Sequence, residues 1–278
     1  MIVFGILNLT TDSFSDGNEA TDPESAIEKA KDLLSQGADV LDLGAQASHP
    51  EAQAKTWQEE WSALEPILDN PAIPNRIVSI DSFRTEVQEL SLGKGVGYLN
   101  DISGFGSPMA PSLFKGLKAD RCPNLVVMHS HTGGIASLQE SPYTVQNVIG
   151  EVLKFLSDRK AQLLSWGIPE KKLIFDPGMG FFLGKDPELS WEVLRNWRTF
   201  RERLGPTLLS VSRKSFLTSI LGPEPPKKRD FATKILELLL YEQGVDFLRT
   251  HDVKGTKEAI SIQNKLLPAL SDTGSQSF

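Results

Sequence analysis

The stretch "LIFDPG" at residues 173–178 contains the pattern from which the fold can be predicted. A short apolar run with β-branched and aromatic side chains ends in an aspartate, and a proline and a glycine follow. A run of this length is too short for a helix, and proline and glycine are typical of a turn. We therefore predict a buried strand whose carboxyl end carries an acidic group.

The same pattern recurs along the chain, and segments of helical period separate its copies. The predicted strands cover residues 2–8, 40–44, 77–81, 98–102, 125–130, 173–178, 208–215 and 247–252. The predicted helices cover residues 23–36, 57–69, 85–92, 111–119, 144–166, 187–204, 231–243 and 256–270. Eight alternating units predict an α/β fold, a (β/α)8 or TIM barrel forming a single domain over residues 1–270. The polar tail at 271–278 is predicted to be disordered.

A doubly wound open sheet is the rival fold for such an alternation. It would need a glycine-rich phosphate turn after its first strand, but "NLTTDSFSDG" at residues 8–17 has neither GxGxxG nor GxxxxGK[ST]. The barrel is therefore the better prediction.

Composition excludes several classes of function. The net charge of −7 argues against a general electrostatic grip on nucleic acid or anionic lipid. The chain has one cysteine, Cys122, so no internal disulfide can form, as is usual in a reducing cytoplasm. No apolar run approaches the roughly 20 residues of a membrane span. We expect a cytoplasmic protein that binds small molecules, not nucleic acid or membrane.

In a TIM barrel the carboxyl ends of the strands line the active site. Polar groups occupy all eight predicted strand ends: Asn8, Asp42, Asp81, Asn100 with Asp101, His129, Asp176, Lys214, and Arg249 with His251. Charge so close to a packed barrel interior is costly unless it is paired or bound. The sequence therefore predicts a polar ligand pocket.

Two kinds of chemistry can be separated among these groups. One set combines carboxylates, an amide and an amine, which suits a flat heterocycle with an amidine-like edge: Asp81, Asn100, Asp176 and Lys214. The other suits an anion with an oxygen-coordinated divalent metal: Asn8, Arg249 and His251. The four histidines and the single cysteine lack zinc-ligand spacing, and we interpret the pair His129 and His131 as structural or loop-lining.

Five motifs in this order resemble dihydropteroate synthase: "GILNLTTDSFSDG" (5–17), "LNDI" (99–102), "FDPGMGF" (175–181), "SRKS" (212–215) and "RTHDV" (249–253). The resemblance covers residues 3 to about 253. That family is a TIM barrel, in agreement with the strand pattern. Its transferases join 6-hydroxymethyl-7,8-dihydropterin pyrophosphate to para-aminobenzoate, using Mg²⁺ and releasing pyrophosphate in folate biosynthesis.

The resemblance also implies roles for individual residues. It implies a pterin site of Asp81, Asn100, Met128, Asp176 and Lys214, with Asp81, Asp176 and Lys214 catalytic. It implies that Asn8 helps to hold Mg²⁺ and that pyrophosphate contacts Asn8, His49, Arg249 and His251. It implies a para-aminobenzoate site of Phe14, Ser48, Pro50, Phe181, Phe182 and Ser212.

The chain departs from the common family pattern in two loops. "GAQASHP" at residues 44–50 has Gln46 where glutamate is usual and His49 where arginine is usual, and a neutral imidazole cannot replace a bidentate cation. "GMGFFLGK" at 178–185 carries two extra residues. These departures resemble the mobile sulfonamide-resistance synthases. Phe181 or Phe182 is predicted to wall the para-aminobenzoate pocket and exclude the larger drug, with loop packing as the alternative.

Three alternatives for function stay open, and so does the oligomeric state. Lys214 could be a Schiff-base lysine as in barrel aldolases. The chain could be a pterin-dependent methyltransferase, or a pterin-binding relative without turnover. We expect a homodimer formed through outer helices, with the run 235–240 or the helix of Trp191 and Trp197 as candidate surfaces.

Overall fold

Eight parallel strands form one sheet in the computed structural model, which describes residues 1–9, 22–46, 54–134 and 140–266. Their spatial order is β6-β5-β4-β3-β2-β1-β8-β7. The strands are β1 (Ile2–Asn8), β2 (Val40–Gly44), β3 (Val78–Asp81), β4 (Tyr98–Asp101), β5 (Asn124–Met128), β6 (Leu173–Asp176), β7 (Leu208–Leu209) and β8 (Phe247–Thr250). A bridge between Phe175 of β6 and Thr207 joins the two outermost strands. The sheet is a nearly closed barrel.

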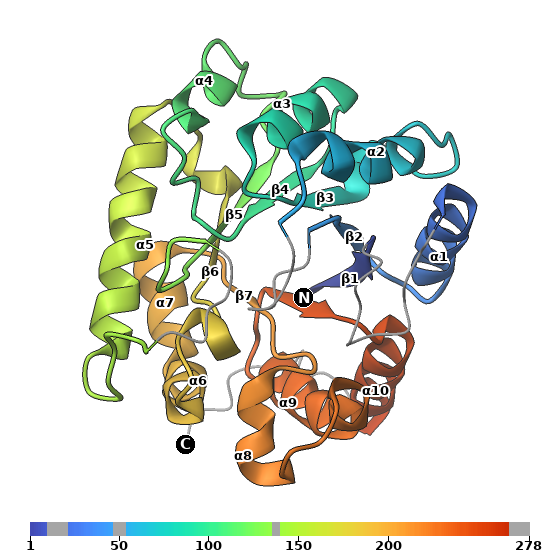
Figure 1. Cartoon of the computed structure of the whole chain (residues 1–278). Coiled ribbons are helices and arrows are strands. Elements are labelled where there is room, and N and C mark those ends of the chain that lie inside the picture. Colours follow the sequence, from blue (N-terminus) through green and yellow to red (C-terminus); the bar gives the residue numbers. More distant parts are fainter. Residues whose placement is uncertain (10–21, 47–53, 135–139, 267–278) are drawn as a thin grey trace, which may run out of the picture.

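Helices surround the barrel on the outside (Figure 1). They are α1 (Pro23–Ser35), α2 (Trp57–Leu68), α3 (Thr85–Lys94), α4 (Ala110–Phe114), α5 (Val148–Ser165), α6 (Pro187–Arg195), α7 (Trp197–Leu204), α8 (Thr218–Leu221), α9 (Asp230–Glu242) and α10 (Val253–Leu266). The predicted (β/α)8 architecture is confirmed. The predicted tail at 271–278 lies outside the described residues. No helix in the described part of the chain is long and apolar enough to cross a bilayer.

Helix starts follow from local sequence chemistry. Thr56 accepts the amide of Glu59 while the Glu59 carboxylate accepts the Thr56 amide, a reciprocal capping box at the start of α2. Asp22 caps α1 through the Ser25 amide, and Pro23 occupies the first turn. Each cap satisfies helix amides that lack a partner and stabilises its helix by about 1 kcal/mol.

The predicted strand 208–215 is wrong in length, because β7 ends at Leu209. The chain turns at residues 211–214, where the Lys214 amide donates to the Val211 carbonyl at 3.3 Å. Arg213 there has φ of 58°, in the left-handed region. A strand cannot pass through that conformation, so the residues after β7 form a loop.

Two predicted helices are also corrected. The helix 187–204 is divided at Asn196, whose side-chain amide donates to the Glu192 carbonyl at 3.0 Å and so competes with the backbone. The helix 111–119 ends at Phe114, because Lys115 is extended and Gly116 has φ of 75°. Glycine adopts that left-handed conformation without steric cost.

The interior of the barrel is filled from its amino-terminal end by an apolar layer. Its members are strand residues that cluster apart from the main core: Phe4, Val40, Val126, Ile174 and Leu208, with Ile2, Tyr98 and Phe247 packed against them. The ring of Phe4 makes edge contacts with those of Tyr98 and Phe247. The main core lies between the outer face of the strands and the helices, where Trp197 and Phe200 are fully buried.

Candidate active site

The predicted polar residues lie one layer above this apolar layer. Alternate residues of a strand face the same side of a sheet. Five polar or thioether side chains therefore follow the inner layer at a spacing of two: Asp42 after Val40, Asn100 after Tyr98, Met128 after Val126, Asp176 after Ile174, and Arg249 after Phe247. Strand register places Asp81 beside Asn100 and Met128 beside Asp176. The residues of β3 to β6 that were predicted to hold pterin therefore lie together at the carboxyl-terminal mouth of the barrel.

Arg249 connects two of the carboxylates at this mouth. Its Nε is 2.5 Å from Asp42 Oδ2, and its Nη2 is 2.6 Å from Asp81 Oδ2. The Asp42 side chain is fully buried and that of Arg249 is 14% exposed. Burial opposes the charge on Arg249, but the carboxylates of Asp42 and Asp81 outweigh it and raise the guanidinium pKa. The guanidinium therefore stays charged inside the barrel.

Asp81 is held in a poorly solvated position near the end of β1. Burial raises the pKa of Asp81 to about 7, against the Arg249 charge that favours ionisation and with a further contribution from Asp42. A Cβ on Gly44 would lie 3.7 Å from Asn8 Oδ1 and 3.7 Å from Asp81 Oδ2. The position that a Gly44 side chain would occupy is thus close to both the carboxamide of Asn8 and the carboxylate of Asp81.

Asp176 ends β6 and is 2% exposed. Its Oδ1 accepts the amide of Gly178 at 2.8 Å. Burial raises the pKa of Asp176 to about 6, although the Gly178 amide and the Lys214 charge favour the ionised form. Gly178 has φ of 77°, and a Cβ there would lie 2.4 Å from the His129 carbonyl oxygen. Only glycine fits this turn, so the loop after β6 leaves the strand at a fixed angle.

The two neighbouring polar residues at the end of β4 have different surroundings. Asn100 is 3% exposed, and its Oδ1 makes no hydrogen bond to any described residue. Asp101 accepts from the Gln88 side chain and from the amide and hydroxyl of Ser103. Asp101 is therefore satisfied within the protein, whereas Asn100 presents a buried acceptor that a ligand can use.

An apolar cluster borders the polar residues on the β5 and β6 side. Ile102, Met128 and Phe182 form it, with Phe83 and Phe181 packed against them. The Lys214 ammonium lies 5.0 Å from the centroid of the Phe182 ring. A flat ring therefore finds apolar surface, acceptors and a cation within one site.

The comparisons with known proteins agree with this geometry. A family model described as "Pterin binding enzyme" matches residues 4–251. The chain is 40% identical to a dihydropteroate synthase type-2 of Escherichia coli, over 98% of this chain and 97% of that protein. The family-model match begins within β1, ends just after β8 and includes every strand end described above.

This chain belongs to the dihydropteroate synthase family. It is an enzyme of the transferase class. Solved synthases have the same fold. The structure from Anaplasma phagocytophilum with bound 6-hydroxymethylpterin-monophosphate has a TM-score of 0.81, 32% identity, and coverage of 96% of this chain and 99% of that chain. The structure from Xanthomonas albilineans with 4-aminobenzoic acid has a TM-score of 0.82, 30% identity, and coverage of 96% and 93%.

The synthase-type loop after β6 divides its two phenylalanines between different environments. Phe182 is 5% exposed and packs on Met128, next to the residues predicted to hold pterin. Phe181 is half-buried and lines a cavity of about 100 Å³ together with Gly180, Ser190 and Ser215. Both were predicted to border para-aminobenzoate, and Phe181 is the one that faces a cavity.

Two residues that the family resemblance assigns to different ligands, Ser212 and His251, contact each other. Ser212 Oγ lies 2.9 Å from His251 Nδ1 and 3.2 Å from the His251 amide. Ser212 is buried, whereas His251 is half-buried and lines a polar cavity of about 320 Å³. The predicted para-aminobenzoate residue and the predicted pyrophosphate residue therefore form one unit between the ends of β7 and β8.

Four predicted site residues, Phe14, Ser48, His49 and Pro50, lie outside the described residues. Beside that loop, Gln46 Oε1 accepts the Lys55 amide at 2.8 Å. The Lys55 carbonyl oxygen accepts a hydrogen bond from the Arg84 guanidinium. That guanidinium also forms an ion pair with the buried carboxylate of Glu60 at 3.2 Å.

Both histidines of the H-x-H pair have protein partners. Burial lowers the pKa of His129 to about 3, so the ring is neutral, and its Nε2 is 3.0 Å from the Tyr143 hydroxyl. His131 Nδ1 lies 3.2 Å from the Phe182 carbonyl oxygen.

The partnership of Asp42 with Arg249 was missed from the sequence. The available signal was weak: "VLDLG" places an acid in the middle of a strand, where it must be paired. No group of three or more histidine, cysteine, aspartate or glutamate side chains in the described ranges could hold a metal ion.

Proposed function

We propose that this enzyme condenses 6-hydroxymethyl-7,8-dihydropterin pyrophosphate with para-aminobenzoate to give 7,8-dihydropteroate and pyrophosphate. Membership of the synthase family supports this reaction, and so do the pterin phosphate and 4-aminobenzoic acid bound by two structural relatives. The observation that carries the proposal is the buried acceptor set of Asp176 and Asn100 beside the apolar cluster of Met128 and Phe182.

The pterin would lie with its face on the apolar cluster and its N–H edge on the acceptors. The Asp176 carboxylate can accept two parallel N–H groups, and Asn100 Oδ1 can accept a third. At neutral pH Asp176 is mostly ionised, because its pKa is about 6. The Lys214 ammonium, near both Asp176 and the Phe182 ring, would donate to a ring acceptor.

Excess negative charge at the mouth supports cleavage of the C–O bond to pyrophosphate. As that bond breaks, positive charge spreads over the pterin. Three carboxylates (Asp42, Asp81 and Asp176) stand against two cations (Arg249 and Lys214), which leaves one net negative charge when all are ionised. Fixed charge in a poorly solvated site stabilises a developing cation without reorganisation. We assign this role first to Asp81 and then to Asp176; the Arg249 ion pair at 2.6 Å offsets part of the Asp81 charge.

Pyrophosphate would leave on the β1 and β8 side, toward Asn8, Arg249 and His251. Mg²⁺, when bound, would neutralise charge on the departing anion. Mg²⁺ is commonly held by one or two protein oxygens, with substrate phosphates and waters completing its shell. The Asn8 carboxamide beside the Asp81 carboxylate fits that requirement, so we assign Asn8 as the metal ligand among the described residues.

The arylamine of para-aminobenzoate needs placement more than deprotonation, so proximity is the remaining contribution. We assign Ser212 and Phe181 to its site. A Schiff base on Lys214 would require a neutral amine, but Asp81 and Asp176 both attract the ammonium form. Lys214 is therefore a binding group, and no covalent intermediate is required.

Weak inhibition by sulfonamides follows from the loop after β6. The substrate ends in a small planar carboxylate, whereas the drug has a tetrahedral sulfonyl group with a further substituent. Phe181, which lines the cavity of about 100 Å³, could exclude the substituent and spare the substrate. Phe182 is already packed on Met128 and is less suited to that role.

A homodimer is supported by an apolar stripe on α9. Phe231 is 79% exposed, and Ile235 and Leu239 are nearly half exposed at successive i, i+4 positions. Ile262 and Leu266 are exposed on the neighbouring helix α10. Contiguous exposed apolar side chains of this kind mark an interface. On the other predicted surface Trp197 is buried, whereas Trp191 is half-buried.

The proposal is tested with isotope-labelled para-aminobenzoate, the pterin pyrophosphate and Mg²⁺. Labelled dihydropteroate is the expected product. Tight pterin binding without that product would instead identify a pterin-binding relative without turnover. Methyl transfer from a methyltetrahydrofolate donor would identify the methyltransferase alternative.

A further inference from the structure

Arg213 is held in a strained backbone conformation directly before Lys214. Its φ is 58°, and among the described residues other than glycine only Phe105 shares a positive φ. A residue with a Cβ has a higher energy there and stays there only when surrounding contacts hold it. Because Lys214 follows at once, the direction in which Lys214 leaves the backbone depends on the conformation of Arg213.

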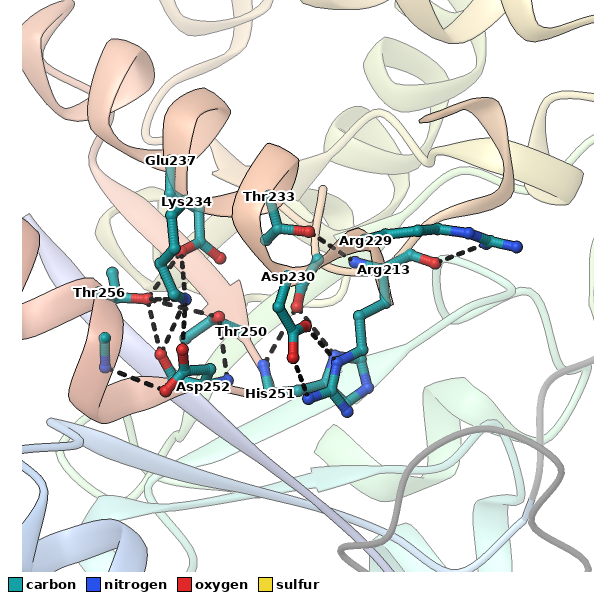
Figure 2. A network of polar contacts seen from close by, with 12 residues as sticks. Arg213, Arg229, Asp230, Thr233, Lys234, Glu237, Thr250, His251, Asp252 and Thr256 are labelled. Atoms are coloured by element: carbon teal, nitrogen blue, oxygen red, sulfur yellow. Dashed lines mark hydrogen bonds and ion pairs between the residues drawn. The ribbon is translucent and has the colours of Figure 1, made fainter. Parts of the chain in front are cut away.

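The start of α9 supplies those contacts, as Figure 2 shows. The Arg213 amide donates to Thr233 Oγ1 at 3.1 Å, and the Arg213 carbonyl accepts from Arg229 Nη1 at 2.9 Å. The guanidinium binds both oxygens of Asp230, at 2.6 and 2.9 Å. The backbone donor, backbone acceptor and side chain of Arg213 are thus all engaged by residues 229–233.

The same helix is fixed to the loop after β8. Lys234, the residue after Thr233, donates to the Asp252 carbonyl at 2.9 Å, to Thr256 Oγ1 at 2.8 Å and to Glu237 Oε2 at 3.0 Å (Figure 2). Glu237 and Thr256 are each 1% exposed. A buried network of this kind resists sliding, because displacement leaves buried polar groups unpaired. The start of α9 is therefore a rigid support.

We infer that Asp230 and Thr233 are positioning residues for Lys214. They fix Arg213 in its left-handed conformation, and this directs the Lys214 ammonium toward the Phe182 ring and Asp176. Neither residue touches the pterin. The inference rests on the proposed function, in which Lys214 binds the pterin.

The expected loss of pterin affinity depends on the fraction of molecules in which Arg213 keeps its left-handed conformation and Lys214 is in place. Apparent affinity falls in proportion to that fraction. The hydrogen bond from the Arg213 amide to Thr233 corresponds to about a fivefold change in the loop equilibrium. Thr233→Val keeps the shape of the side chain and removes the acceptor. A fivefold fall in this equilibrium lowers the fraction in place by at most fivefold, so we expect this substitution to weaken 6-hydroxymethylpterin binding by up to about fivefold and to raise the KM for the pterin substrate by the same factor.

The test compares four variants of the full chain by calorimetric pterin binding and thermal unfolding. Thr233→Ser restores the acceptor and should bind like the wild type. Thr207→Val is the matched control: Thr207 is fully buried at the start of β7, and its hydroxyl donates to the Gly205 carbonyl at the opposite end of the barrel. It should lose thermal stability without losing pterin affinity. Asp230→Ala, at a partly exposed carboxylate, should weaken pterin binding without preventing folding.

A double-mutant cycle separates positioning from a general structural effect. In a Lys214→Met background, Thr233→Val should change pterin affinity less than twofold, because the group that it positions is gone. A loss in that background as large as the loss in the wild-type background would overturn the inference, as would unchanged pterin affinity for both Thr233→Val and Asp230→Ala. The wild-type protein is measured first. If it neither binds pterin nor makes dihydropteroate, the proposed function is wrong, and the variants are not compared.

Discussion

Asp81 of β3 and Arg249 of β8 form an ion pair at the mouth of the barrel, with 2.6 Å between Oδ2 and Nη2. The same guanidinium also binds Asp42 of β2. One cation therefore serves two carboxylates that lie above the apolar layer of the barrel. The Arg249 charge favours the ionised form of Asp81, whose pKa burial raises.

Replacing Arg249 by Met should destabilise the protein by about 3 kcal/mol near neutral pH, because two buried carboxylates lose their partner. Burial already raises the folded-state pKa of Asp81 from 3.8 to about 7, and loss of the Arg249 charge, which lowers it, raises it further. The folded state binds protons that the unfolded state releases, so the unfolding free energy should fall as pH rises from about 5 to about 8. Urea unfolding at both pH values measures this.

The matched control is Arg201→Met, which breaks the Arg201–Asp246 pair at a guanidinium that is 52% exposed. Exposed pairs contribute about 0–1 kcal/mol. Equal losses in the two variants at the higher pH would show that burial of the Arg249 cluster has no energetic consequence.

Asp176→Asn should weaken pterin binding roughly 10- to 100-fold, because a charged acceptor on the N–H edge is exchanged for a mixed donor and acceptor. In the wild type the folded-state pKa of Asp176 is about 6, so pterin affinity should fall as pH drops below that value and the carboxylate is protonated. The variant should show no such fall. Titration of 6-hydroxymethylpterin across the range measures both; a variant curve parallel to the wild type would assign the pH dependence to another group.

Asn100→Leu should separate stability from function. Asn100 Oδ1 is buried without a hydrogen bond to the described residues, which costs about 1–3 kcal/mol in the free enzyme. We expect the variant to unfold at higher urea concentration and to bind pterin at least tenfold more weakly. Asn124→Leu at the opposite end of the barrel, where the amide donates to the Gly97 carbonyl, should leave pterin affinity unchanged. A stabilised Asn100→Leu protein with normal affinity would remove Asn100 from the site.

Phe181→Gly should increase inhibition by sulfamethoxazole about tenfold with little change in KM for para-aminobenzoate, because under the proposed function this ring excludes the drug substituent and spares the substrate. Phe182→Gly should instead weaken pterin binding, since Phe182 packs on Met128. Inhibition constants for the two variants measure the difference. Unchanged inhibition of Phe181→Gly would mean that the ring only packs the loop.

The fold could be predicted because strand and helix periods are local properties of the sequence. The period of two along a strand also places Asp176 and Asn100 above the apolar layer without any knowledge of the partners. The short β7 could not be predicted, because it depends on the turn that Arg213 makes through contacts with Thr233, 20 residues later.

The ion pairs within the site could not be predicted from the sequence either. Asp42 and Arg249 are 207 residues apart, and no local pattern relates them. The two phenylalanines of the loop after β6 are adjacent in sequence, and only packing decides that Phe182 covers Met128 while Phe181 lines a cavity. Residue type alone therefore did not reveal the partners of these side chains.

A crystal structure with bound 6-hydroxymethylpterin tests the central claim most directly. We predict one ring on Met128 and Phe182, with its N–H edge within about 3 Å of Asp176 and Asn100 and with the Lys214 ammonium at hydrogen-bond distance. A pterin bound elsewhere, or at the mouth but facing away from Asp176 and Asn100, would contradict the account.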